Sequence, residues 1–461
     1  MSEPFLSSRS PSRRSLLWSS AAGFGAVALA GLIGLGSRRT SGEGPRPNGL
    51  LVPKSPHFPA KARRIIFLFM EGAMSQVDTF EYKPALQAGD GSTGPGGGRL
   101  VASKFRFTQH GQTGTWVSEL YPHVARHVDE LCFLRGLHTD TPAHPQAVIQ
   151  LHTGAANASL TRPSLGSWLL YGLGTENQDL PGYVAINPSP NFGGAINYGS
   201  AFLPAHFQGT KISDTGALPN LVRAAPPQLQ RRQLDYLQEL NRDLQGDPAA
   251  PAELEGIIQS YELAFQMQDS VPRLLDLSDE PKWVLEEYGV TAGPRGSFAR
   301  QCLMARKLCE AGVRFVEIRH PGWDHHNNLH KGLIAGAAAT DRPTAALLAD
   351  LKRRGLLDDT LVLFGSEFGR QPTAQGNDGR DHNITGYPMW LAGAGVKPGF
   401  CYGATDDFGV HAVEGRMHTT DLHATLLALM GLDHERLTYT YGGRDFRLTD
   451  VAGDVVREIM A

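Results

Sequence analysis

The chain has 461 residues, of which 41% are hydrophobic and 19% are charged, and its formal net charge is −3. This composition is typical of a globular protein, and the length allows two ordinary domains or one large α/β domain with insertions. The small net charge argues against nucleic acid or an acidic membrane surface as a partner. The cysteines show neither metal-site nor disulfide-framework spacing; they are Cys132, Cys302, Cys309 and Cys401.

The N-terminal residues 1–36 have the features of an export signal. Arg13 and Arg14 precede an uncharged run, rich in Ala and Gly, that extends from 21 to 36. The run is short and weakly hydrophobic for a membrane span, which needs ~20 strongly apolar residues. The segment around the two arginines resembles a twin-arginine signal, with a candidate cleavage site at 28–30. We therefore predict export to the periplasm or cell surface; the alternative is an uncleaved N-terminal anchor, the one predicted link to a membrane.

A linker rich in Pro, Gly, Arg and Ser, residues 37–60, precedes a predicted folded domain at 61–461. That domain begins with a continuous apolar run at 65–70, which is typical of a strand buried on both faces of a parallel sheet. Glu71 and Gly72 follow directly, so a carboxylate lies at the carboxyl end of the strand. In open α/β sheets, ligands bind at that edge.

The rest of the domain alternates apolar runs with amphipathic segments. Helical spacing predicts helices at 226–246 and 252–277, within a helical insertion over about 220–290. Beyond it, we predict strands at 312–320, 360–365 and 387–393, and helices at 297–311, 341–354 and 419–431. This order predicts an α/β fold with a doubly wound, mostly parallel central sheet.

Carboxylates and imidazoles follow several of these predicted strands. Asp324 and His326 come after the strand at 312–320, Glu367 ends the strand at 360–365, and His382 lies shortly beyond it. A single histidine on a loop is more often a surface or core residue than a ligand, so the prediction depends on the clustering. Mixed nitrogen and oxygen ligands favour one or two divalent ions, and zinc, manganese and calcium are the candidates.

Several motifs resemble the alkaline phosphatase and sulfatase superfamily. "TLVLFGSEFG" is similar to its strand ending in Ser-Asp-His-Gly, "IIFLFMEG" to its first strand, and "TTDLHATLLALMGLD" to a helix near the end of sulfatase domains. The resemblance implies an alkaline phosphatase/sulfatase-like fold and metal-dependent hydrolysis of phosphate or sulfate esters. The implied substrate is an anionic ester, which includes sulfated or phosphorylated polysaccharides.

Nearly the whole chain also resembles an exported bacterial family, domain of unknown function 1501. The segments that carry this resemblance are "GAMSQVDTFEYKPAL", "RPSLGSWLLYGLGTENQDLPGYV", "GWDHHNN", "EFGR" and "GRDHN". This family resemblance implies no particular activity.

The chain departs from the superfamily at several implied ligand positions. Glu367 is followed by Phe368 where the superfamily has Asp-His, so one imidazole is missing. Glu71 replaces an Asp, and Asn328 stands where a His is expected, so that His326 or His325 would substitute. The metal ligands implied with these changes are Glu71, Asp324, His326, Glu367 and His382.

The attacking group has three candidates: His144, Ser75 and water. "HPQAVIQLHTG" resembles the sulfatase helix that begins at the catalytic Cys or Ser, which places His144 at the nucleophile position. The chain lacks Cys-x-Pro-Ser-Arg, which argues against a formylglycine sulfatase. His144 would accept a phosphoryl group, act as a general base, bind metal or serve only structure. Ser75 is otherwise a helix N-cap next to Asp78.

Arg370 is the third predicted catalytic residue, because a guanidinium can hold an anionic oxygen with two hydrogen bonds. Its alternative is a salt bridge to Glu367 or Asp381. The sequence thus supports an exported metal-dependent ester hydrolase. The alternative is a catalytically altered member of the same fold that binds a polysaccharide or a surface partner.

Overall fold

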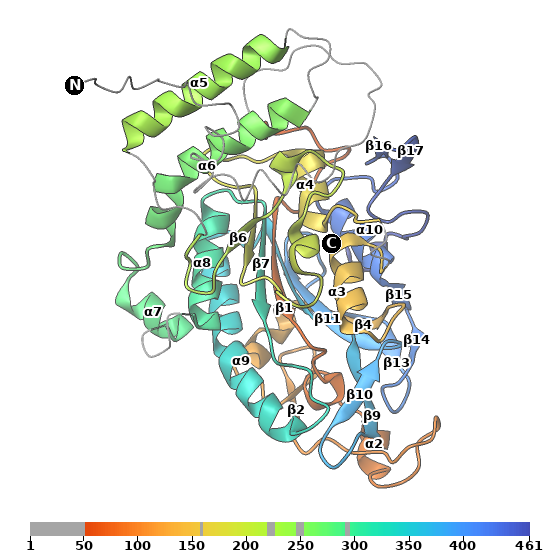
Figure 1. The fold of residues 1–461 in the computed structure, drawn as a ribbon. Coiled ribbons are helices and arrows are strands. Elements are labelled where there is room, and N and C mark those ends of the chain that lie inside the picture. Colours follow the sequence, from red (N-terminus) through yellow and green to blue (C-terminus); the bar gives the residue numbers. More distant parts are fainter. Residues whose placement is uncertain (1–50, 157–159, 219–225, 246–252, 291–295) are drawn as a thin grey trace, which may run out of the picture.

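The computed structural model describes residues 51–461 except for 157–159, 219–225, 246–252 and 291–295 (Figure 1). The predicted export signal and most of the linker lie outside the described residues. Among the helices of the described part, none is both long enough and apolar enough to cross a membrane.

A nine-stranded sheet forms the centre of the fold, in the order β12-β4-β11-β8-β1-β7-β5-β6, with β15 paired to β4 (Figure 1). Its strands are β1 (Arg64–Met70), β4 (Leu131–His138), β5 (Tyr183–Ile186), β6 (Thr210–Ile212), β7 (Phe315–His320), β8 (Thr360–Gly365), β11 (Tyr387–Gly393), β12 (Phe400–Tyr402) and β15 (Met417–His418). All pairs are parallel except those that β11 makes with β4 and β8. The predicted α/β fold with a mostly parallel central sheet is confirmed.

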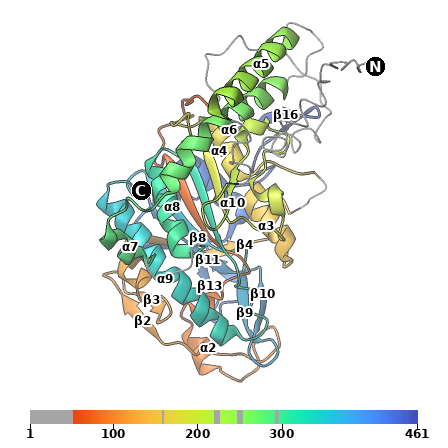
Figure 2. The same cartoon turned by 60° about the vertical axis from the view of Figure 1, so that its left-hand side comes forward.

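Helices cover both faces of this sheet (Figures 1 and 2). The α-helices of the described part are α2 (Pro84–Ala88), α3 (His144–Thr153), α4 (Leu165–Leu173), α5 (Pro227–Gln245), α6 (Glu253–Leu275), α7 (Lys282–Tyr288), α8 (Phe298–Glu310), α9 (Leu329–Arg353) and α10 (Thr419–Leu429), of which α2 and α5 lie away from the sheet faces. The core on one face includes apolar residues of α6, α7, α8 and α9. The core on the other face includes apolar residues of α3, α4 and α10. The predicted insertion contains α5, α6 and α7; its extent as a separate unit stays a prediction.

Strand β1 shows why the centre of the sheet needs apolar residues on both sides. Ile66 and Leu68 belong to one core, while Ile65 and Phe67 belong to the other, and every residue of the strand is buried. Hydrophobic burial on two faces accounts for the continuous apolar run seen in the sequence. Predicted strands and helices correspond to β1, β7, β8, β11, α5, α6, α8 and α10.

Two elements differ from the sequence prediction. Helix α9 begins at Leu329, well before the predicted start at 341, although its first half is rich in Gly and Ala and Pro343 lies inside it. Strand β4 was not predicted, because Arg135 and Gly136 interrupt its apolar run. Tertiary packing decides both cases: α9 packs on α8, and β4 pairs with β11.

The remaining strands form two-stranded sheets: β2 (Phe107–His110) with β3 (Thr115–Ser118), β9 (Gly369–Ala374) with β10 (Arg380–Asn383), β13 (Ala404–Thr405) with β14 (Ala412–Glu414), and β16 (Tyr439–Tyr441) with β17 (Arg444–Phe446). Short 3-10 helices lie at Gln76–Asp78, Val124–Glu130, Gly194–Tyr198, Ala205–Phe207 and Arg457–Ile459. The β9–β10 hairpin connects β8 to β11, and this connection positions part of the site.

Candidate metal centre

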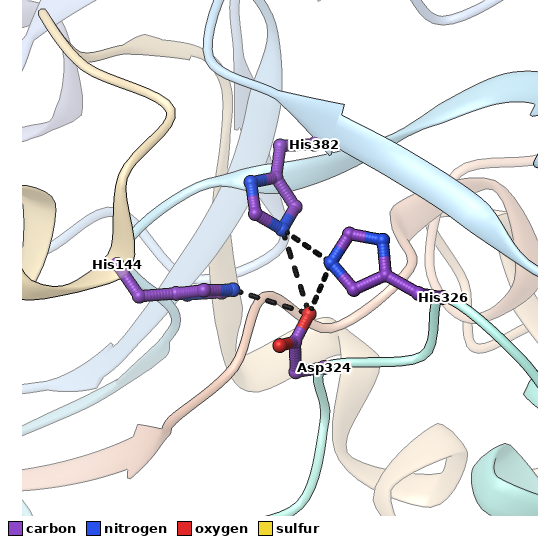
Figure 3. A group of neighbouring side chains, drawn as sticks. All are labelled: His144, Asp324, His326 and His382. Carbon is purple, nitrogen blue, oxygen red and sulfur yellow. Dashed lines mark hydrogen bonds and ion pairs between the residues drawn. The ribbon is translucent and has the colours of Figure 1, made fainter. Parts of the chain in front are cut away.

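Four side chains from different parts of the chain meet at one point: His144, Asp324, His326 and His382 (Figure 3). One potential ligand atom from each lies within 4.8 Å of the others. Within the described part of the chain, this is the one group of three or more His, Cys, Asp or Glu side chains whose potential ligand atoms lie this close together. It contains three residues that the sequence predicted as metal ligands, together with the predicted catalytic residue His144.

The sheet topology explains how these residues converge. Strands β4 and β7 run parallel to β1, so the segments that follow them leave at the same edge of the sheet. His144 begins α3 after β4, and Asp324 and His326 follow β7. Strand β11 runs in the opposite direction, so it begins at the edge where β8 ends, and the β9–β10 hairpin between them lies at this edge. His382, on β10 just before β11, is therefore brought to the same place.

The rings of His326 and His382 face each other through their Nε2 atoms, which are 2.9 Å apart. His382 Nδ1 lies 2.6 Å from the carbonyl oxygen of Pro142, and His326 Nδ1 contacts the Oε1 atom of Gln375. Because both of these oxygens accept hydrogen bonds, each Nδ1 carries the proton. In the neutral rings, both Nε2 lone pairs then point into the centre of the group.

Asp324 supplies the oxygen at this centre. Its Oδ1 atom lies 2.8 Å from His326 Nε2, 3.2 Å from His144 Nε2 and 3.4 Å from His382 Nε2. Partial burial disfavours the charged carboxylate, but the contacts of Asp324 with His144, His382 and the positively charged Arg370 outweigh burial and hold the pKa of Asp324 well below its usual range. Asp324 is therefore a carboxylate at neutral pH.

His144 is the most buried of the three histidines, with an exposed fraction of 7%. Its Nδ1 atom lies 2.6 Å from Glu367 Oε1, and its Nε2 atom faces Asp324. Burial lowers the pKa of His144, but the hydrogen bonds and negative charges of Asp324 and Glu367 outweigh burial and raise that pKa to about 9.

This arrangement fits a divalent cation. Three imidazole Nε2 atoms and one carboxylate oxygen converge, while each Nδ1 has an acceptor on its far side. The Nε2 atom of His144 is buried and makes no hydrogen bond of good geometry among the described residues; it faces Asp324 Oδ1 at 3.2 Å. Lone pairs turned toward one another repel unless a proton or a cation lies between them. Three nitrogens and one oxygen suit zinc, and also manganese.

Glu71 and Glu367, which were also predicted as ligands, lie outside this group. Glu71 is buried and its Oε1 atom lies 2.6 Å from the Nη2 atom of Arg319 on β7. Glu367 is buried against His144 and accepts a hydrogen bond from the backbone N–H of Gly72 at 2.9 Å. Arg319 thus pairs with one oxygen of Glu71, whose Oε2 atom is buried without a hydrogen-bond partner among the described residues, and donors from the protein compensate Glu367. Metal ligation by either residue stays a prediction.

Arg370 is completely buried, and its donors are already used. Its Nη2 atom lies 2.6 Å from Asp324 Oδ1, in place of the expected partners Glu367 and Asp381. The guanidinium also donates to the backbone oxygens of Gly72, Ala73, Trp323 and Arg380. In this geometry Arg370 holds Asp324 and the loop after β1; contact with an anionic substrate stays a prediction.

Ser75 is also completely buried, so its hydroxyl does not face solvent. The Oγ atom donates to Asp78 Oδ2 at 2.6 Å, and Asp78 pairs with Arg380. The alternative role expected for Ser75, a helix N-cap through its side chain, is absent from the described contacts of this short helix. Its hydroxyl is therefore part of a series of buried polar contacts that continues through Asp78 to Arg380. A catalytic role for Ser75 stays a prediction.

His325, the alternative to His326, points away from the group. Its ring packs against α9, where a Cβ atom on Gly332 would lie 2.2 Å from its Nε2 atom. Burial lowers the pKa of His325 to about 4. His326, and not His325, therefore belongs to the candidate metal centre.

Sequence reasoning did not identify the groups that support the histidines. Gln375 and the carbonyl of Pro142 hold His326 and His382, and Phe192 stacks on His144 with ring centroids 5.2 Å apart. These residues lie outside the strand-end motifs and are not metal ligands of the usual types. The one available signal was their closeness in sequence to predicted ligands, as for Pro142 beside His144.

Comparison with known proteins places the chain among solved structures of low similarity. The lipoteichoic acid synthase LtaP from Listeria monocytogenes is 9% identical, with a TM-score of 0.38, and the match covers 86% of this chain and 78% of that chain. A protein in the alkaline phosphatase superfamily from Vibrio parahaemolyticus is 10% identical, with a TM-score of 0.37 and coverage of 82% and 68%. The C-terminal periplasmic domain of EcEptC from Escherichia coli, in complex with Zn, is 9% identical, with a TM-score of 0.37 and coverage of 85% and 88%.

Similarity at this level does not indicate a shared activity. One of these proteins belongs to the superfamily that the sequence motifs resemble. The comparison with curated protein sequences found no match. A family model matches residues 62–460, and the chain therefore belongs to the family described as protein of unknown function, DUF1501.

Proposed function

We propose that the protein is a hydrolase of phosphate or sulfate esters that uses one divalent metal ion. His144, Asp324, His326 and His382 would bind this ion at the carboxyl edge of the sheet. The observation that carries the proposal is the convergence of three Nε2 atoms and one carboxylate oxygen, with an acceptor behind every Nδ1. Export and the twin-arginine signal belong to the same proposal and rest on the sequence of residues 1–36.

The proposal includes one ion and not two. A second ion would need further carboxylate or imidazole ligands, and the nearest predicted ones are Glu71 and Glu367. Arg319 already neutralises Glu71, while Glu367 is hydrogen-bonded to His144 and Gly72. Removing a buried carboxylate from its partner is expensive, so these side chains favour their present contacts.

A bound divalent ion would polarise an ester oxygen and lower the pKa of a coordinated water molecule. Water is the attacking group in this proposal, because the Ser75 hydroxyl is buried and hydrogen-bonded to Asp78. Asp324 is the most exposed of the four proposed ligands, so substrate would approach from its side. Phosphate and sulfate esters both present the anionic oxygens that such an ion binds.

A second candidate function is a binding module that keeps the fold without catalysis. The observation that favours it is the burial of both the Ser75 hydroxyl and the Arg370 guanidinium, which removes two groups predicted to act on substrate. Such a module would bind a polysaccharide or a surface partner. Hydrolysis by the metal-loaded protein distinguishes the two functions.

The first experiment is elemental analysis of the purified protein, together with the variants His382→Ala and His326→Ala. His411→Ala is the matched control, since His411 is exposed and outside the four-residue group. We expect about one equivalent of zinc or manganese in the wild type and in the control, and its loss in the two other variants. A metal-free wild-type protein that also fails to take up added zinc or manganese would refute the proposal.

Activity is then measured on nitrophenyl phosphate, phosphodiester and sulfate substrates. Hydrolysis that depends on the added ion and disappears in His382→Ala supports the hydrolase. Metal binding without hydrolysis of any ester class supports the binding module.

A further inference from the structure

We infer that Glu367 is a positioning residue, whose carboxylate fixes the ring of His144 so that Nε2 faces the candidate metal centre. The inference rests on the proposed metal site and concerns a residue that the sequence predicted as a direct ligand. It assigns Glu367 to the far side of the His144 ring.

The contacts of Glu367 leave it little freedom. Its exposed fraction is 1%, and its Oε1 atom lies 2.6 Å from His144 Nδ1 and 2.9 Å from the backbone nitrogen of Gly72. Glu367 follows β8, while Gly72 follows the neighbouring strand β1. The carboxylate thus links the ends of β8 and β1. This link holds its acceptor oxygen in a fixed position next to His144 Nδ1.

Two phenyl rings fix the plane of His144. The Phe192 ring stacks on it at 5.2 Å with an interplanar angle of 10°, and the Phe368 ring lies at 4.7 Å with an angle of 31°. The ring of His382 meets it edge-on at 4.4 Å. Aromatic contacts hold the ring plane, and the Glu367 hydrogen bond selects which nitrogen points outward.

The chemistry of the imidazole separates Glu367 from the metal ligands. The two ring nitrogens point in diverging directions, so a carboxylate that accepts from Nδ1 does not reach an ion bound at Nε2. An acceptor on Nδ1–H also fixes the tautomer and makes Nε2 a better electron donor. His326 and His382 have neutral acceptors in Gln375 and the Pro142 carbonyl, whereas His144 has a carboxylate.

The test uses Co²⁺ as a spectroscopic probe on the full chain and compares Glu367→Gln with His382→Ala. In Glu367→Gln the amide oxygen can still accept from both His144 and Gly72, so the hydrogen bonds survive while the negative charge is lost. We expect Glu367→Gln to bind one equivalent of Co²⁺ about 10- to 100-fold more weakly than the wild type, with unchanged visible absorption bands. We expect His382→Ala to lose Co²⁺ or to change its bands, because a ligand is removed.

Two results would overturn the inference. If Glu367→Gln loses Co²⁺ as completely as His382→Ala, Glu367 is a ligand. If its affinity equals that of the wild type, Glu367 has no effect on His144. A wild-type protein that does not bind Co²⁺, zinc or manganese refutes the metal site itself, so this failure is distinct from the other two.

A second variant covers the case in which Glu367→Gln does not fold. Phe192 is only half-buried, and Phe192→Leu removes the stacked ring while keeping an apolar side chain. We expect about 2- to 12-fold weaker Co²⁺ binding with unchanged bands, since an aromatic pair contributes in that range. Unchanged affinity in a folded Phe192→Leu protein would contradict the aromatic part of the inference.

Discussion

The Nη2 atom of Arg370 lies 2.6 Å from Oδ1 of Asp324, the same oxygen that faces the histidines of the candidate metal centre. Arg370 has no exposed surface and also donates to four backbone oxygens. The guanidinium therefore connects the Asp324 carboxylate to the loops after β1 and β7. A planar set of donors of this kind is available only to arginine.

Arg370→Lys is expected to lower the free energy of unfolding by about 2–4 kcal/mol, because lysine leaves buried backbone oxygens without donors. It should also weaken metal binding, since Asp324 loses its fixed orientation. Thermal unfolding and metal titration measure the two effects. An Arg370→Lys protein as stable as the wild type would show that the buried contacts of Arg370 contribute little.

Gly72 allows the loop after β1 to pass close to the loop that carries Asp324. It has a φ of +114°, and a Cβ atom there would lie 2.6 Å from the backbone nitrogen of Asp324. Gly322 has a φ of +96°, but a Cβ atom added to it would meet nothing within 4 Å, so it is a matched control. We expect Gly322→Ala to cost about 1 kcal/mol from backbone strain alone.

Gly72→Ala should cost more and should also reduce metal affinity, because the clash displaces Asp324. Equal effects of the two substitutions on metal affinity would contradict a steric role for Gly72. Metal titration together with thermal unfolding of both variants gives the comparison.

His423 is expected to make the protein less stable in acid. It is completely buried on α10, its Nε2 donates to the Leu151 carbonyl at 2.8 Å, and burial lowers its pKa to about 4. The unfolded chain has an ordinary histidine pKa of about 6.5, so below that pH the unfolded state binds the proton more readily. The stabilisation is complete above pH ~6.5 and is lost as the pH falls toward 4, a change of about 3 kcal/mol.

The measurement is the thermal midpoint between pH 7.5 and 4 for the wild type and for His423→Gln, which keeps a hydrogen-bond donor. The wild type should lose more stability over this interval than the variant does. Parallel curves would show that His423 does not contribute to the acid sensitivity.

His152 and Glu317 form a buried ion pair between α3 and β7. His152 Nε2 lies 3.0 Å from Glu317 Oε1, and both side chains are about 4% exposed. Burial disfavours the imidazolium, but the charge and hydrogen bond of Glu317 outweigh burial and raise the pKa of His152. Glu317→Leu alone is expected to cost about 3–5 kcal/mol, because a buried histidine loses its partner.

The double variant His152→Leu/Glu317→Leu should be much less destabilised than the sum of the two single variants. Denaturant unfolding of the four proteins measures the coupling. Additive costs would contradict a direct interaction between the two side chains.

The elements that the sequence predicted best are those whose local pattern and tertiary role agree. The apolar runs of β1 and β8 are buried on both faces, and the rhythm of strands and helices follows from that burial. Strand β4 escaped prediction because its pairing with β11, and not its own pattern, decides its conformation. The first half of α9 was not predicted either, because packing on α8, and not its local pattern, decides its conformation.

The sequence predicted a metal centre at the carboxyl ends of the strands, but it did not predict correctly which residues lie together there. Asp324, His326 and His382 meet as expected, whereas Glu71 contacts Arg319 and Glu367 contacts His144. A carboxylate at a strand end takes whichever cation or donor the fold brings nearest. That partner comes from a distant segment, so local sequence cannot identify it.

Because β11 is antiparallel to its neighbours, the site has two halves that differ in how they are attached to the central sheet. His144 and the loop after β7 are anchored directly to the nine-stranded sheet, whereas His382 is carried by the two-stranded β9–β10 hairpin outside it. A small hairpin opens at lower free energy than a central sheet, so its amides should exchange with solvent sooner. A bound cation would connect the two halves. Slower amide hydrogen exchange across 369–383 would then report metal binding, and this measurement needs no substrate.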